Sequence, residues 1–104
     1  MKTYNYYKKM KEDVKEYLQN TEERDFDALY DEMFVDDSIT GNGSGSYTFS
    51  TYEAEENICH NFDLLKKACE EFCCDIPKDA EKADVTIRCY LLSQVLGEVL
   101  EEEE

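Results

Sequence analysis

Five cysteines and a single histidine are the residues of this chain best suited to hold a metal ion or to carry redox chemistry. Four of the cysteines and the histidine occur within 16 residues, at Cys59, His60, Cys69, Cys73 and Cys74. The C-x-x-C spacing of common zinc and thioredoxin-like sites is absent. We therefore expect five reduced thiols, with Cys59, Cys69 and Cys89 packing as small apolar residues, and no cofactor. A thiol-based metal or redox site is the alternative.

Neither of two further motifs points to catalysis. The run Gly41-Asn42-Gly43-Ser44-Gly45-Ser46 is similar to a phosphate-binding loop, but no lysine follows it and its third glycine is one position too early for a dinucleotide site. His60 has no serine or cysteine that the sequence assigns to it as a triad partner. We expect a structural turn, a capping or solvent-facing histidine, and a protein that is not an enzyme.

Acidic residues are the remaining candidates for a functional site. The chain has 26 acidic and 11 basic residues, a net charge of −15, which repels nucleic acid and anionic membranes and attracts basic protein surfaces. Asp27, Asp31, Glu32 and Asp36 recur at about one-turn spacing on the expected outward side of one helix. Carboxylates one turn apart, about 5–6 Å, can imitate part of a phosphate array. The sequence predicts partner binding at these four residues; the alternative is a solvated, solubilising face.

Targeting signals are not evident in the chain. No stretch approaches the roughly 20 apolar residues that span a bilayer, and the N-terminus runs into charged residues instead of a signal-peptide core. An odd number of cysteines would leave at least one thiol unpaired in an oxidising compartment, whereas reduced thiols are normal in the cytosol. We expect a cytoplasmic protein.

Two helices are predicted in the first third of the chain by apolar residues at helical spacing. The first, over residues 3–19, has its stripe at Tyr7, Met10, Val14, Tyr17 and Leu18. The second follows an N-cap at Thr21 or Asp25, with its stripe at Phe26, Leu29, Tyr30, Met33 and Phe34. The first helix carries the basic residues, and residues 21–37 carry eight acidic side chains and one basic one, net −7.

The middle of the chain changes character. Three alternating glycines among β-favouring residues predict a small β-hairpin or a Gly-rich loop at about 38–49. Ser50 and Glu53 match a capping box, so a helix should begin near Thr51. Its pattern continues to Phe72, and Asn61-Phe62-Asp63 resembles a stop followed by a new N-cap. The sequence leaves open whether this region is one helix or two.

The last helix should follow Pro77, with Asp79 or Asp84 as its N-cap. Its wide apolar face places it at the centre of the core. The alternative is a strand at 85–91, because Val85-Thr86-Ile87 is β-rich. Glu101–Glu104 should be a disordered tail, since carboxylates are unfavourable at the negative end of a helix. We thus predict a mainly α protein of four or five helices in a single domain over 1–100, or an α+β fold if the strand forms.

Several segments together resemble a group of uncharacterised small acidic proteins of Gram-positive phages and integrative mobile elements. They are Thr40–Phe49, Glu53-Ala54-Glu55, Asn61, Asp63-Leu64-Leu65 and Asp84–Tyr90, and the resemblance covers roughly residues 38–92. It implies a bacterial cytoplasm. It also implies a mobile element, whose small acidic products sometimes inhibit host defence proteins by occupying their DNA-binding surfaces.

The leading functional hypothesis is a non-enzymatic acidic module that binds a protein with a basic surface. Its most specific form is a DNA mimic that inhibits a host nuclease or DNA-binding regulator. Two alternatives belong to other classes: the thiol-based metal or redox protein, and a self-associating structural protein that buries Tyr4, Tyr6 and other exposed aromatics. Direct binding to nucleic acid or to a membrane is not expected.

Overall fold

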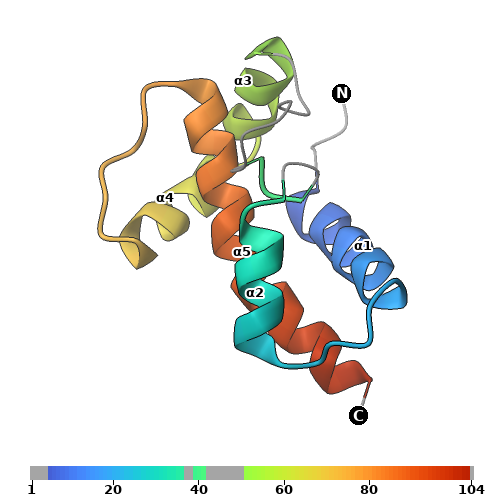
Figure 1. The fold of residues 1–104 in the computed structure, drawn as a ribbon. Helices are drawn as coiled ribbons and strands as arrows, with labels where there is room; N and C mark the ends of the chain where they lie inside the picture. The colour runs from blue at the N-terminus through green and yellow to red at the C-terminus, as the bar shows by residue number, and fades with distance from the viewer. Residues whose placement is uncertain (1–4, 37–38, 42–50, 104) are drawn as a thin grey trace.

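The computed structural model describes residues 5–36, 39–41 and 51–103, in which four helices pack against a fifth (Figure 1). The helices are α1 (Tyr6–Gln19), α2 (Phe26–Phe34), α3 (Thr51–Cys59), α4 (Phe62–Glu71) and α5 (Ala80–Glu102). The prediction of a mainly α fold is confirmed, and the described residues contain no strand. Of the hairpin or loop expected at 38–49, residues 39–41 form a turn and the others lie outside the described residues.

Helix α5 is the axis of the fold. Its 23 residues span about 34 Å at 1.5 Å per residue, close to the molecule's longest dimension of 37 Å. In Figure 1 it runs diagonally through the molecule, with α1 and α4 on opposite sides. The core is one cluster that α1, α2, α4 and α5 share, and its fully buried members include Val14, Leu29, Met33, Leu65, Ile87, Leu92, Val95 and Leu96. The central placement predicted for this helix is confirmed.

The alternative strand at 85–91 is wrong, because the whole segment is helical. Helical geometry buries Ile87, Leu91 and Leu92 together against the packing helices. Complete burial of one such side chain stabilises the fold by about 1.5–3 kcal/mol, more than the roughly 0.7 kcal/mol that a poor helix former costs. Tertiary burial therefore outweighs the β preference of the Val85-Thr86-Ile87 sequence.

Side-chain caps begin three of the helices. Asn5 caps α1 by accepting from Lys8 N–H at 2.9 Å, Asp25 caps α2 by accepting from Ala28 N–H at 3.0 Å, and Asp79 caps α5 by accepting from Glu81 N–H at 2.8 Å. Of the alternatives left open by the sequence, Asp25 and Asp79 are the caps. Each satisfies a backbone donor that has no partner within the helix.

Replacing Asp25 with alanine should lower the free energy of unfolding by about 1 kcal/mol, because the Ala28 N–H loses its acceptor at the start of α2. Urea denaturation followed by circular dichroism measures the change. Glu23→Ala is the matched control, since its side chain is exposed and does not cap a helix. Equal stability of the two variants would show that the cap contributes nothing.

The region from Thr51 to Phe72 is two helices, separated at His60 and Asn61. Asn61 makes the junction, because its Nδ2 donates to the Asn57 carbonyl at 2.7 Å while its own carbonyl accepts from Leu64 and Leu65 N–H. The side chain therefore ends α3, and it makes no side-chain cap for α4.

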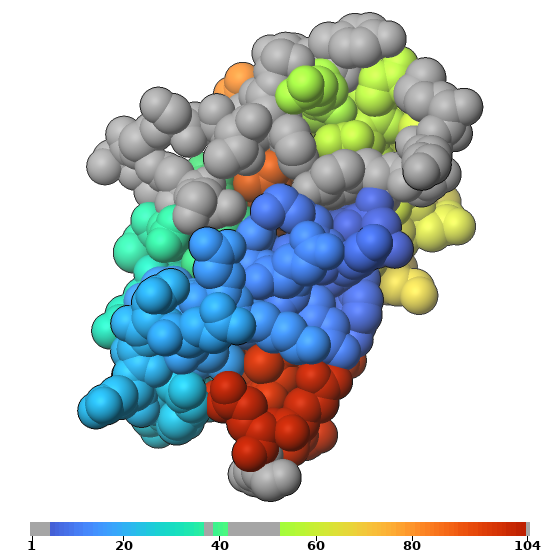
Figure 2. All heavy atoms as spheres, turned by 90° about the vertical axis from the view of Figure 1, so that its right-hand side faces the viewer, coloured from blue at the N-terminus to red at the C-terminus, as the bar shows by residue number. Residues whose placement is uncertain are grey.

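The expected disordered tail at 101–104 is wrong for the residues described, since α5 continues through Glu102 and Glu103 is its C-cap. Cations from elsewhere offset the unfavourable position of these carboxylates. Lys11 Nζ lies 2.8 Å from Glu102 Oε1, and Arg24 Nε lies 2.8 Å from Glu103 Oε2. Figure 2 shows the C-terminal end of α5, in red, against α1, in blue.

Candidate functional site: the acidic edge of α2

The four predicted partner-binding residues, Asp27, Asp31, Glu32 and Asp36, are here called the α2 acidic edge. Asp27 and Asp31 lie one turn apart on α2 with exposed side chains, as the spacing predicted. Neither makes an ion pair with any residue in the described ranges. Both carboxylates are therefore available to a cation from outside the chain.

Glu32 and Asp36 differ from this pair because contacts within the molecule hold them. The Tyr17 hydroxyl of α1 donates to Glu32 Oε2 at 2.7 Å. This hydrogen bond, with burial as a smaller cause, raises the pKa of Tyr17 to about 12. Asp36 is half-buried beyond the end of α2, and its carbonyl accepts from the backbone N–H groups of Ile39 and Thr40. The structure thus divides the predicted set into an outward pair and two residues tied to the fold.

An aromatic row lies beside the acidic edge. Phe26 and Tyr30 stack with ring centroids 6.0 Å apart, and Tyr30 and Phe34 follow at 5.6 Å. Phe26 is 36% exposed, so the first ring of the row reaches the surface. A surface that combines carboxylates with an exposed ring suits an arginine side chain, which pairs with the carboxylate and stacks on the ring.

Arg24 is the one cation in residues 21–37, and the fold directs it away from the acidic edge. Its guanidinium donates to the carbonyls of Leu18, Thr21 and Glu23 at 2.6–3.2 Å. These bonds secure the connection between α1 and α2, and the same group pairs with Glu103. The negative charge of α2 is therefore not offset locally.

Three of the four lysines of α1 are likewise paired within the molecule. Lys9 pairs with Asp13 at 2.6 Å, and Lys11 and Lys15 lie 2.8 and 4.0 Å from the Glu102 carboxylate. The hydrogen bond to Glu102 raises the pKa of Lys11, and the same bond lowers the pKa of Glu102. Exposed pairs of this kind contribute little to stability, because water and salt screen the charges and ordering two long side chains costs entropy. Their larger effect is on the field, since they leave little positive charge for an acidic ligand.

The thiols do not form a metal site in the described residues. All five cysteines are free, and no group of three or more Cys, His, Asp and Glu side chains among the described residues is placed to hold a metal ion. Cys69 and Cys89 are buried, as predicted. The prediction for Cys59 is wrong, because Ile58 takes the inward position at the end of α3 and Cys59 is exposed.

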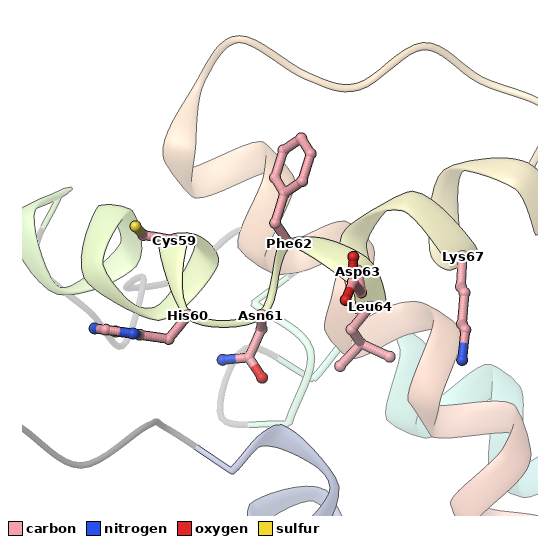
Figure 3. Close-up of a pocket in the computed structure, with 7 residues that line it drawn as sticks. All are labelled: Cys59, His60, Asn61, Phe62, Asp63, Leu64 and Lys67. Atoms are coloured by element: carbon pink, nitrogen blue, oxygen red, sulfur yellow. The ribbon is translucent and has the colours of Figure 1, made fainter.

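A pocket of about 410 Å³ lies at the corner between α3 and α4. Its lining residues are Cys59, His60, Asn61, Phe62, Asp63, Leu64 and Lys67. Figure 3 shows Phe62 projecting to one side of the chain and His60 and Asn61 to the other, so these side chains do not converge on one point. His60 Nε2 lies 3.7 Å from Glu56 Oε2, one turn earlier on α3. The pocket thus lacks the convergent polar groups that a small-molecule site needs.

A buried polar cluster, which the sequence pattern did not predict, joins α1 to α5. Asp84 is completely buried; its Oδ1 accepts from the Tyr6 hydroxyl at 2.5 Å and its Oδ2 lies 3.1 Å from Arg88 Nε. Asp84 was considered as an N-cap, yet it lies inside α5. The sequence signal for this ion pair was an acidic and a basic residue four positions apart within an apolar run.

Tyr6 was predicted to be an exposed aromatic available for self-association. That prediction is wrong, because the Tyr6 side chain is 3% exposed and packs inside the core. The hydrogen bond from its hydroxyl to Asp84 satisfies the polar end of the side chain, which allows a tyrosine to be buried there. Tyr4 and the glycine run after Gly41 lie outside the described residues.

The fold and the acidic edge define the chain as a small helical protein with a strongly negative surface. Comparisons with protein-family models, curated proteins and solved structures found no match to this chain. Among the described residues, no helix has both the length and the apolar composition needed to cross a membrane.

Proposed function

We propose that this chain is a non-enzymatic binding module, acting in a bacterial cytoplasm, that docks a basic protein surface against the α2 acidic edge. The observation that carries the proposal is the pair Asp27 and Asp31, exposed at one-turn spacing while Arg24 is engaged elsewhere. A net charge of −15 attracts a basic partner toward such a surface, over a distance that shortens as the salt concentration rises.

The most specific form of this function is DNA mimicry, in which the protein occupies the DNA-binding face of a nuclease or regulator. Carboxylates about 5–6 Å apart on consecutive turns present negative charge as a row. The neighbouring Phe26 ring gives an arginine from the partner an apolar surface to stack on. The resemblance to small acidic proteins of mobile elements supports the same kind of target.

The experiment is capture of partners from nuclease-treated bacterial lysate by the tagged full chain, with elution in steps of rising salt. Bound partners should leave as the screening length falls from about 10 Å at 0.1 M to about 3 Å at 1 M salt. Retention that persists at 1 M salt would overturn an electrostatic mode of binding.

Mimicry is tested separately by adding short duplex DNA to the washed complex at low salt, without nuclease. Duplex DNA should displace the partner if both ligands use one surface. If the partner stays bound at saturating DNA, mimicry is wrong, while the basic-partner proposal is judged on the salt series alone.

A further inference from the structure

The C-terminus of α4 is a cap that brings two cysteines together. Cys74 N–H donates to the Cys69 carbonyl at 3.0 Å, and Cys73 N–H donates to the Glu70 carbonyl at 3.2 Å. These two bonds define a Schellman motif, in which the first and last residues lie close together and their side chains are frequently in contact. Here the residues at these two positions are Cys69 and Cys74.

The residue at the left-handed position of this motif is Cys73, with a φ of 53°. Glycine usually occupies that position because a Cβ is unfavourable there. Among the described non-glycine residues, Cys73 alone has a positive φ. Because this backbone turn reverses the chain at the end of α4, it returns Cys74 to the side of the helix where Cys69 lies.

The distance between the two residues suits a disulfide. A 3.0 Å bond from Cys74 N to Cys69 O, with standard covalent lengths, holds the two Cα atoms within about 7 Å of each other. Disulfides join Cα atoms about 4.4–6.8 Å apart. Burial raises the pKa of the Cys69 thiol, and the side chain of Cys74 raises it further.

The two thiols differ in access. Cys69 is 4% exposed and Cys74 is exposed, so a dissolved oxidant reaches Cys74 first. The remaining thiols are less suited to pair with them. Cys89 is buried on α5, Cys59 lies beyond the opposite end of α4, and Cys73 is adjacent to Cys74, where a disulfide would have to close between neighbouring residues.

We propose that Cys69 and Cys74 form a reversible oxidation site, which closes to an intramolecular disulfide at the expense of a low-molecular-weight disulfide. The Cys74 thiolate attacks one sulfur of the small disulfide, forms a mixed disulfide and releases the first small thiolate. Cys69 loses its proton to solvent, and its thiolate attacks the Cys74 sulfur, releasing the second small thiolate. The protein loses two electrons and two protons, and the small disulfide becomes two thiols.

The site is independent of the α2 acidic edge and goes beyond the binding function. The bridge would close a six-residue ring around the end of α4. The connection that follows Cys74 contributes Ile76 and Pro77 to the wall of a second pocket of about 270 Å³. Oxidation would therefore restrain the backbone just before this part of the pocket wall.

The test is equilibration of the purified full chain in buffers of reduced and oxidised glutathione, followed by quenching with an alkylating reagent and mass spectrometry. A protease that cleaves after glutamate separates Cys69 from Cys73 and Cys74, because Glu70 and Glu71 lie between them. A Cys69–Cys74 bridge therefore holds two peptides together until a reductant is added, whereas a Cys73–Cys74 bridge leaves them separate.

We expect Cys69 and Cys74 together to lose two hydrogens, to carry no glutathione and to yield the linked peptides. Cys69→Ala should abolish the link and accumulate glutathione on Cys74. Cys73→Gly is the matched control: it removes a thiol, suits the left-handed backbone and should keep the bridge. A stable glutathione adduct on Cys74 of the native chain, a Cys73–Cys74 bridge, or a dimer linked through Cys69 or Cys74 would each overturn the proposal.

Discussion

Replacing Arg88 with methionine should lower the free energy of unfolding by about 3–5 kcal/mol, because it removes the guanidinium that pairs with the buried Asp84 carboxylate. Asp84 is 0% exposed and Arg88 6% exposed, so water does not take over the role of the guanidinium. The Tyr6 hydroxyl still donates to Asp84, but a hydrogen bond does not neutralise the charge. Domains of this size are typically stable by about 5–15 kcal/mol, so the variant should be close to unfolding.

Urea denaturation followed by circular dichroism measures this effect, and the double variant Asp84→Asn/Arg88→Met is its control. The double variant has no buried charge and should regain most of the lost stability, since removing both members of a buried pair is far less costly than removing one. If Arg88→Met alone unfolds at the urea concentration of the native chain, the pair is not a buried ion pair.

Raising the pH should destabilise the protein through Cys89. Burial raises the pKa of this thiol from 9.0 to about 11, with Arg88 acting weakly in the opposite direction. The stabilising effect of keeping the thiol neutral is fully present below pH 9 and is lost as the pH rises to about 11. A difference of two pKa units corresponds to about 2–3 kcal/mol.

Comparison with Cys89→Ala isolates this contribution. Tyr30 and Tyr17 also have raised pKa values and add their own losses at higher pH in both proteins. The measurement is the free energy of unfolding from pH 8 to 11, taken as the difference between the native chain and the variant. That difference should shrink steadily above pH 9, and a constant difference would show that Cys89 does not titrate in this range.

The helices were predictable wherever apolar spacing and caps agree. The stripe of Met10, Val14 and Leu18 predicted α1, and that of Leu29 and Met33 predicted α2; all five residues are completely or almost completely buried. Asp25 and Asp79 were among the predicted caps because a short acceptor side chain precedes each apolar run. These signals are local, so a single sequence carries them.

The errors arose where distant residues decide the outcome. Glu102 is helical because Lys11, 91 residues earlier, lies beside it, and Tyr6 is buried because Asp84, 78 residues later, accepts its hydroxyl. Periodicity within one segment does not contain such contacts. The candidate site was predicted in position, yet Glu32 proved to be tied to α1 through Tyr17, which spacing along α2 could not indicate.

For the thiols too, spacing along the sequence predicted one part of the arrangement and the folded backbone decided the other. Sequence spacing placed Cys69 in the core and set Cys73 one turn beyond it, where a metal site was the natural alternative. The left-handed conformation of Cys73 changes the geometry, because it brings Cys74 rather than Cys73 back to Cys69. A cysteine at a position that usually takes glycine gave no recognisable signal in the sequence.

The most direct test of the binding proposal compares two variants that each remove two negative charges. Asp27→Asn/Asp31→Asn neutralises the outward pair on α2, and Glu12→Gln/Glu16→Gln neutralises two exposed carboxylates at the same spacing on α1. Circular dichroism first establishes that both variants are folded. Each is then titrated against the partner captured by the native chain, at low salt.

At about 0.2–1 kcal/mol for each exposed charge pair, the α2 variant, which loses two pairs, should bind about 2- to 30-fold more weakly, and the α1 variant should change affinity less than about twofold. Equal weakening of both variants would mean that net charge alone attracts the partner. Unchanged binding by the α2 variant would contradict the assignment of the acidic edge as the docking surface.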